Sequence, residues 1–199
     1  MDVKSLAMFC LVFGGALVLP GPNAAFSVAQ SIHYGFFKAL PVAFGFAIGT
    51  LANSAAVLFG LGLVVAQHPA LFDLFKWIGI IYLFYLSIQI YIAGIGDLNG
   101  RPKSTSSLNL LVGALVVSLT NPKGLLWAAL IFPPFISPAS PYEIQAMMLV
   151  SAAVFLSFSV YAGYILVAHS IRGRLLAWPY THKVICAVYA LVGIALALR

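Results

Sequence analysis

Two prolyl breaks interrupt long apolar runs of this sequence, and each carries an asparagine. The first is Pro20-Gly21-Pro22-Asn23 and the second is Asn121-Pro122-Lys123. Asparagine before proline is a typical helix start, because asparagine caps the first amides and proline needs no N–H at the first helical position. A half-helix that starts inside an apolar run directs free amides and a positive dipole end at that point. The breaks therefore predict a site that stabilises an anionic group such as a carboxylate.

Lys123 is the only charged residue well inside a predicted membrane span. A lysine at mid-helix costs about 2.5–3.5 kcal/mol on insertion scales, so an intramembrane lysine is by default a functional hypothesis. The alternative is that its ammonium snorkels or pairs with backbone carbonyls at the other break. The four acidic residues fall at predicted span ends or in loops, which leaves Lys123 as the best candidate for a titrating group.

Further polar residues occur at positions where they could line the same path. Thr50 and Asn53 belong to the second apolar run and join the predicted site. Single serines and threonines in spans usually bond to their own helix, so the others stay open: Ser27, Gln30, Ser54, Ser118 and Thr120. The predicted substrate-binding residues are Pro20, Gly21, Pro22, Asn23, Thr50, Asn53, Asn121, Pro122 and Lys123.

The composition is that of a polytopic membrane protein. The 199 residues are 63% hydrophobic and 7% charged, whereas a soluble domain carries roughly 25% charged residues. The formal charge of +6 comes from basic residues scattered through short loops, which makes no face for nucleic acid. The expected partners are the lipid bilayer and a small-molecule substrate, and the sequence leaves a homo-oligomer open.

Six apolar stretches each reach the roughly 20 residues that a membrane span needs. They cover about 5–32, 40–66, 71–95, 108–135, 143–168 and 182–198. Six basic residues flank the predicted loops at 33–39, 96–107 and 170–182, against three on the other side. The positive-inside rule puts those loops in the cytoplasm and both termini outside.

The polar, turn-rich stretch 99–107 divides the single transporter domain 1–199 into halves 1–98 and 108–199. Three spans per half give the halves opposite orientations. Each break falls about 15 residues into the first helix of its half, and paired breaks at matching positions point to a transporter's binding site. The sequence therefore predicts an all-α membrane protein of six transmembrane helices, with the first and fourth broken at Pro20–Asn23 and Asn121–Lys123.

The second span carries Gly45 and Gly49, which are four residues apart and favour close helix packing. Cys10 and Cys186 lie far apart in the sequence and form no Cys-x-x-Cys motif. The sequence holds no nucleotide loop or hydrolase motif, and its histidines fall at span ends. No catalytic residue, metal or cofactor is expected, and the chain is not predicted to be an enzyme.

The ordered landmarks over residues 10–135 resemble the LysE/RhtB family of amino-acid efflux translocators. The resemblance implies exporters of about six spans that move amino acids or related small metabolites out across the bacterial cytoplasmic (inner) membrane. Members often have an acidic residue where this chain has Thr50. The alternative function is a membrane redox or assembly protein without solute transport. The matching landmarks are Pro20-Gly21-Pro22-Asn23, Gly35, Lys38, Gly45-x-x-x-Gly49, Trp77-Ile78-Gly79-x-x-Tyr82-Leu83, Asn121-Pro122-Lys123-Gly124 and Phe132-Pro133-Pro134-Phe135.

Overall fold

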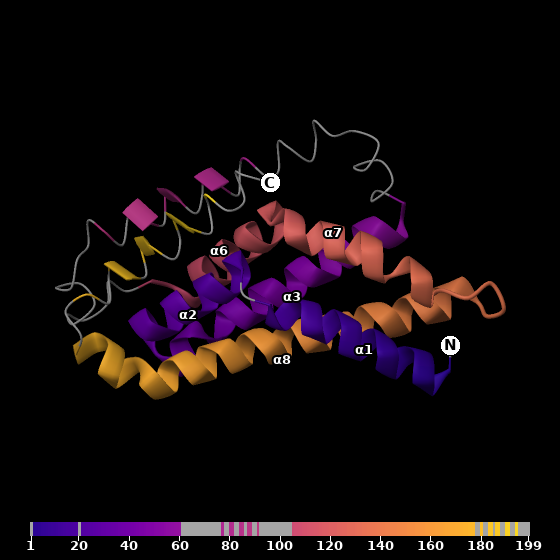
Figure 1. The fold of residues 1–199 in the computed structure, drawn as a ribbon, viewed down its shortest axis with the longest axis horizontal. Helices are drawn as coiled ribbons and strands as arrows, with labels where there is room; N and C mark the ends of the chain where they lie inside the picture. The colour runs from indigo at the N-terminus through magenta and orange to yellow at the C-terminus, as the bar shows by residue number, and fades with distance from the viewer. Residues whose placement is uncertain are drawn as a thin grey trace.

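The protein is built from α-helices in the part of the chain that the computed structural model describes. Those residues are 2–19, 21–60 and 105–177, with scattered positions within 77–91 and 180–194. Figure 1 shows the long helix α8 beside α1, α2 and α3, while α6 and α7 pack on α3. The helices are α1 (Val3–Val18), α2 (Pro22–Tyr34), α3 (Phe36–Leu58), α6 (Ser107–Thr120), α7 (Pro122–Ile131), the 3₁₀ turn η1 (Pro133–Phe135) and α8 (Tyr142–Ala177).

Several of these helices can cross a membrane. Among the described residues, α3 and α8 are each long and apolar enough to do so. Helices α1 and α2 pass the same test together, as a pair bent by 62°. Helix α6 is apolar but shorter. The described chain is therefore all-helical, as predicted, with several apolar helices that can span a membrane.

Helix boundaries fall at both predicted breaks. Helix α1 ends at Val18, Leu19 and Gly21 are extended, and α2 begins at Pro22. Pro20 itself lies outside the described residues. At the second break only Asn121 leaves the helix, with φ −82° and ψ 106°. The residue before a proline avoids the helical region, so Pro122 explains why α6 ends where it does.

The predicted loop at 33–39 is wrong in extent. Helix α2 runs to Tyr34 and α3 starts at Phe36, so Gly35 alone connects them. Its φ of +81° is a conformation that glycine adopts without steric cost. Lys38 therefore lies in the first turn of α3. The basic residue indicates a membrane side, but it does not mark a helix end.

Two other predicted boundaries are also corrected. The second span was expected to reach residue 66, but α3 ends at Leu58 and the chain turns at Gly60, where φ is +82°. The fifth span was expected to end at 168 and a loop to start at 170, but α8 continues to Ala177. Hydropathy reports where apolar sequence stops, and a helix can end before that point or continue beyond it.

Much of the predicted third and sixth spans, 71–95 and 182–198, and most of the linker 99–107 lie outside the described residues. One contact between the two spans is described. The hydroxyl of Ser87 donates to the backbone carbonyl of Cys186 at 3.0 Å, and the Cys186 thiol donates to the carbonyl of Ser87 at 3.3 Å. The two spans therefore meet at this level.

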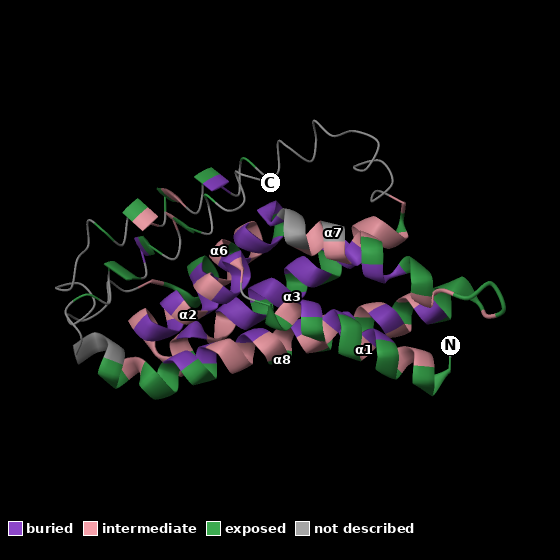
Figure 2. Cartoon of the chain, viewed as in Figure 1, coloured by how far each residue is buried: buried purple, intermediate pink, exposed green. Residues whose placement is uncertain are grey.

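Two separate apolar clusters form the core, and Figure 2 shows their buried residues where the helices face one another. The aromatic cluster joins α1, α7 and α8. The small-residue cluster joins α2, α3, α6 and α8. The aromatic cluster comprises Phe9, Phe13, Ala16, Ala128, Ile131, Phe132, Leu149 and Ala153. The small-residue cluster comprises Phe26, Ala29, Ile32, Ala39, Val42, Ala43, Phe46, Leu110, Ala114, Val117, Tyr161, Ile165 and Ala168.

The close helix packing predicted from Gly45 and Gly49 is confirmed. A Cβ atom on Gly45 would collide with the backbone carbonyl of Leu111, and one on Gly49 would collide with the side chain of Ser118. Only glycine leaves room for α6 at these two positions, for its backbone at Gly45 and for the Ser118 side chain at Gly49. Small residues allow this approach in membranes, where helix association depends on packing.

Candidate functional site

The two breaks meet through their asparagines. The side-chain amide of Asn121 donates to the side-chain oxygen of Asn23 at 2.9 Å, although the residues are 98 positions apart. Both side chains are buried. A buried amide pair is favourable only when its hydrogen bonds are made, so this contact ties the start of α2 to the end of α6.

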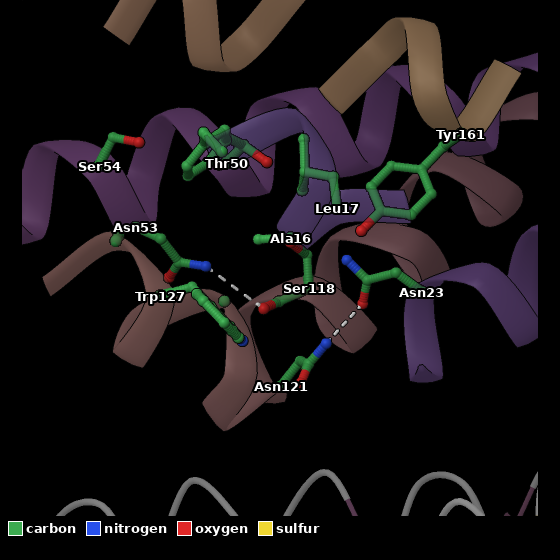
Figure 3. Close-up of a pocket in the computed structure, with 13 residues that line it drawn as sticks. Ala16, Leu17, Asn23, Thr50, Asn53, Ser54, Ser118, Asn121, Trp127 and Tyr161 are labelled. Carbon is green, nitrogen blue, oxygen red and sulfur yellow. Dashed lines mark hydrogen bonds between the residues drawn. The ribbon is translucent and has the colours of Figure 1, made fainter. Parts of the chain in front are cut away.

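A cavity of about 40 Å³, measured as the space open to the centres of water molecules, lies beside this pair. At roughly 10–15 Å³ per water, it holds about three water molecules, which is room for one end of a small solute. Residues of both apolar clusters contribute to its walls (Figure 3). The lining residues are Phe13, Ala16, Leu17, Asn23, Thr50, Asn53, Ser54, Ser118, Asn121, Gly124, Trp127, Ala128 and Tyr161.

Helix α3 supplies one polar wall of the cavity. The amide of Asn53 donates to the backbone carbonyl of Ser118 at 3.5 Å, and the hydroxyl of Thr50 donates to that of Ser157 at 2.8 Å. A Cβ atom on Gly124 would lie 2.9 Å from the Asn53 amide nitrogen. Glycine at the start of α7 therefore leaves the space that Asn53 occupies.

Two tyrosines of α8 lie at the first break, with their hydroxyls directed at its polar groups. Tyr161 is buried, and its hydroxyl points toward the side chain of Asn23 (Figure 3). The hydroxyl of Tyr164 donates to the backbone carbonyl of Val18 at 2.6 Å. Carbonyls at the end of a helix lack intrahelical partners, and inside a membrane other protein groups must satisfy them. Helix α8 thus helps to satisfy the interrupted backbone.

The structure brings part of the predicted site together. Asn23, Thr50, Asn53 and Asn121 all line the cavity. Gly21 and Pro22 form the start of α2, and Pro122 and Lys123 form the first turn of α7. Pro20 and the side chains of Pro122 and Lys123 lie outside the described residues, so the role of the lysine stays a prediction.

The open polar positions divide in two. Ser54 and Ser118 line the cavity. The other three, Ser27, Gln30 and Thr120, do not line the cavity. The Thr120 hydroxyl donates to the carbonyl of Val116, one turn earlier in its own helix. Tyr161 and Trp127 also line the cavity and were not predicted from the sequence. A tyrosine at mid-span is the one signal that could have found Tyr161, because its buried hydroxyl needs a partner.

The described side chains around the cavity suit hydrogen bonding to a small polar solute. Those that are polar carry amides and hydroxyls, and none carries a formal charge. Within the described residues, no cluster of histidine, cysteine or acidic side chains could hold a metal ion. Neither Cys10 nor Cys186 lines the cavity, as a redox function at the breaks would require.

The sequence is similar to those of several known proteins. The sequence profile of the LysE type translocator family matches residues 15–199. The homoserine/homoserine lactone efflux protein of Salmonella typhimurium is 31% identical over 186 residues, covering 89% of this chain and 88% of that protein. The protein of the same name from Salmonella typhi gives the same identity and coverage.

A membrane protein of Vibrio cholerae is also similar. It is 30% identical over 181 residues, covering 90% of this chain and 87% of that protein. No solved structure matches the chain.

Proposed function

Because this chain belongs to the LysE type translocator family, and is therefore a multi-pass efflux translocator and not an enzyme, we propose that it exports a homoserine-like amino acid. The solute binds in the cavity where the two helix breaks meet. One observation carries this proposal, the buried hydrogen bond between Asn23 and Asn121 at the edge of a polar cavity. The Salmonella relatives, named for homoserine and homoserine lactone efflux, support the substrate class.

The breaks offer recognition for the amino-acid end of such a solute. Helices α2 and α7 both begin there, and the first amides of a helix stabilise a carboxylate. Lys123 lies in the first turn of α7. We propose that its ammonium binds or gates the carboxylate beside the first break, with the amides of the second break assisting.

The packing of the halves supports an inverted repeat of six helices. Helix α3 of the first half packs against α6 and α7, and α8 of the second half packs against α1 and α2. Each long helix thus contacts the broken pair of the opposite half. The cavity lies between the aromatic and small-residue clusters, so opening one cluster at a time gives alternating access.

The basic loops orient this mechanism in the bacterial cytoplasmic membrane. With the Gly35 connection between α2 and α3, the stretch 96–107 and the C-terminal end of α8 on the cytoplasmic side, the N-terminus of α1 faces outward. The aromatic cluster then closes the outer side and the small-residue cluster closes the cytoplasmic side. A reporter fused to the C-terminus should read as external, and a cytoplasmic reading contradicts this orientation.

Flux measurements test the proposed function directly. Purified protein in vesicles, loaded with homoserine, homoserine lactone or a panel of amino acids, should release at least one of these solutes faster than protein-free vesicles. Homoserine should rank among the best substrates. Unchanged flux across the whole panel contradicts the exporter proposal.

Lys123→Met tests the part assigned to the lysine. Methionine keeps most of the length and removes the charge, so transport should be lost while membrane insertion is retained. Lys123→Arg should also be impaired, since a broad planar guanidinium does not replace a compact ammonium in a tight gap. Full transport by Lys123→Met removes this residue from the mechanism.

A further inference from the structure

Two serine hydroxyls in the described core are fully buried and make no hydrogen bond. They belong to Ser27 on α2 and Ser54 on α3, and both residues are 0% exposed. Buried hydroxyls in proteins are nearly always paired, so each of these needs an explanation. Their surroundings differ in one respect: Ser54 lines the cavity and Ser27 does not.

Other polar side chains that line the cavity are already engaged. Thr50, one turn earlier on the same face of α3, donates to Ser157. Asn53 donates to the carbonyl of Ser118, and Asn121 donates to Asn23. Ser54 is therefore the described cavity residue whose hydroxyl is both buried and unpaired.

The position of Ser54 fits one end of a solute. Figure 3 shows Ser54 and Asn53 at one end of the cavity, with Asn23 and Tyr161 at the other, beside the helix breaks. A small amino acid bound with its carboxylate at the breaks would extend its side chain toward Ser54. A serine hydroxyl both donates and accepts, so it pairs with a hydroxyl group on that side chain.

We propose that Ser54 determines specificity, because its buried hydroxyl hydrogen-bonds the side-chain hydroxyl of the exported solute. The substrates favoured are small hydroxylated amino acids over their deoxy analogues. This inference rests on the proposed export function. A site with a polar group that only the hydroxylated solute can pair discriminates against the analogue that lacks the hydroxyl.

The test compares homoserine with α-aminobutyrate, which has the same carbon skeleton without the hydroxyl. In reconstituted vesicles, Ser54→Ala should reduce the preference for homoserine by about three- to tenfold, the value of one neutral hydrogen bond. The change should appear as a raised KM for homoserine, with α-aminobutyrate transport unaltered.

Ser27→Ala is the matched control. It also removes a buried, unpaired hydroxyl, but from a position away from the cavity, so the solute preference should stay at the wild-type value. Neither variant should lower the thermal unfolding temperature, since no hydrogen bond within the protein is lost. This keeps a specificity change distinct from misfolding.

The outcomes separate the two proposals. If the wild-type protein transports neither solute, the assignment of Ser54 is contradicted, and if it transports no solute of the panel the exporter proposal is contradicted as well. Wild-type transport combined with an unchanged preference in Ser54→Ala contradicts the assignment alone. An equal loss of preference in Ser27→Ala also overturns it, because the effect would then come from general packing.

Discussion

The aromatic cluster and the small-residue cluster close the two sides of the cavity in different ways. In the aromatic cluster, Phe132 packs edge-on against Phe9 and Phe13, with ring centroids 5.1 and 5.7 Å apart. Beside the small-residue cluster, α3 and α6 approach closely where Gly45 faces the backbone of Leu111 and the cluster residue Ala114. Rings can separate by side-chain rotation, whereas close backbones separate only when a helix moves. The aromatic cluster should therefore tolerate the loss of a side chain better than the small-residue cluster tolerates an added one.

The largest effect is expected from Gly45→Leu. Its Cβ would collide with the backbone carbonyl of Leu111, which no side-chain rotation can relieve. Overpacking typically costs 1–3 kcal/mol and more where the backbone must shift, so this variant should yield little folded protein. Size-exclusion profiles and thermal unfolding in detergent measure this.

Gly163→Leu is the control for that variant. A Cβ at Gly163 on α8 meets no atom within 4 Å, so the substitution should leave folding and transport near wild type. Equal loss of folded protein in both variants would mean that helical glycine, and not the close contact of α3 with α6, is what matters.

A smaller effect is expected from Phe132→Ala in the aromatic cluster. Loss of this fully buried ring leaves a cavity against Phe9 and Phe13. The cost in soluble proteins is about 3–5 kcal/mol, and it should be less here because lipid, not water, surrounds the unfolded side chain. We expect a folded protein with a lower unfolding temperature that leaks homoserine in vesicles. Destabilisation equal to that of Gly45→Leu would contradict the contrast between the clusters.

The smallest effect is expected from Arg172→Gln. Its guanidinium donates to the carbonyls of Ile32 at 2.6 Å and His33 at 3.3 Å, at the C-terminal end of α2. Cations stabilise helix C-termini, and hydrogen bonds from charged groups contribute about 1.5–3 kcal/mol, less where solvent screens them. Unfolding should shift by roughly 1 kcal/mol. Arg174→Gln removes the same charge at an exposed position nearby, and it should lower the free energy of unfolding by less than Arg172→Gln does.

The sequence indicated the features that depend on a local rule. Pro22 and Pro122 start helices because proline lacks an N–H, and Gly45 and Gly49 indicated a close helix contact through their spacing. The mid-span position of Tyr161 indicates a buried hydroxyl that needs a partner, but not that the partner lies at the cavity, because that place follows from how α8 packs on α2 and α3. The helix ends at Leu58 and Ala177 were missed for another reason, since hydropathy carries no signal for a helix end.

The central claim, that the solute binds in the cavity between the breaks, is tested most directly by thiol protection. Ala16→Cys places a thiol on the cavity wall, in a protein where Cys10 and Cys186 are replaced by serine. Cys10, on the same helix but away from the cavity, serves as the comparison in a protein lacking only Cys186. Homoserine should slow alkylation of the thiol introduced by Ala16→Cys and leave alkylation of Cys10 unchanged. If homoserine leaves the alkylation rate unchanged at both positions, in proteins that still export homoserine, the proposed binding site is contradicted.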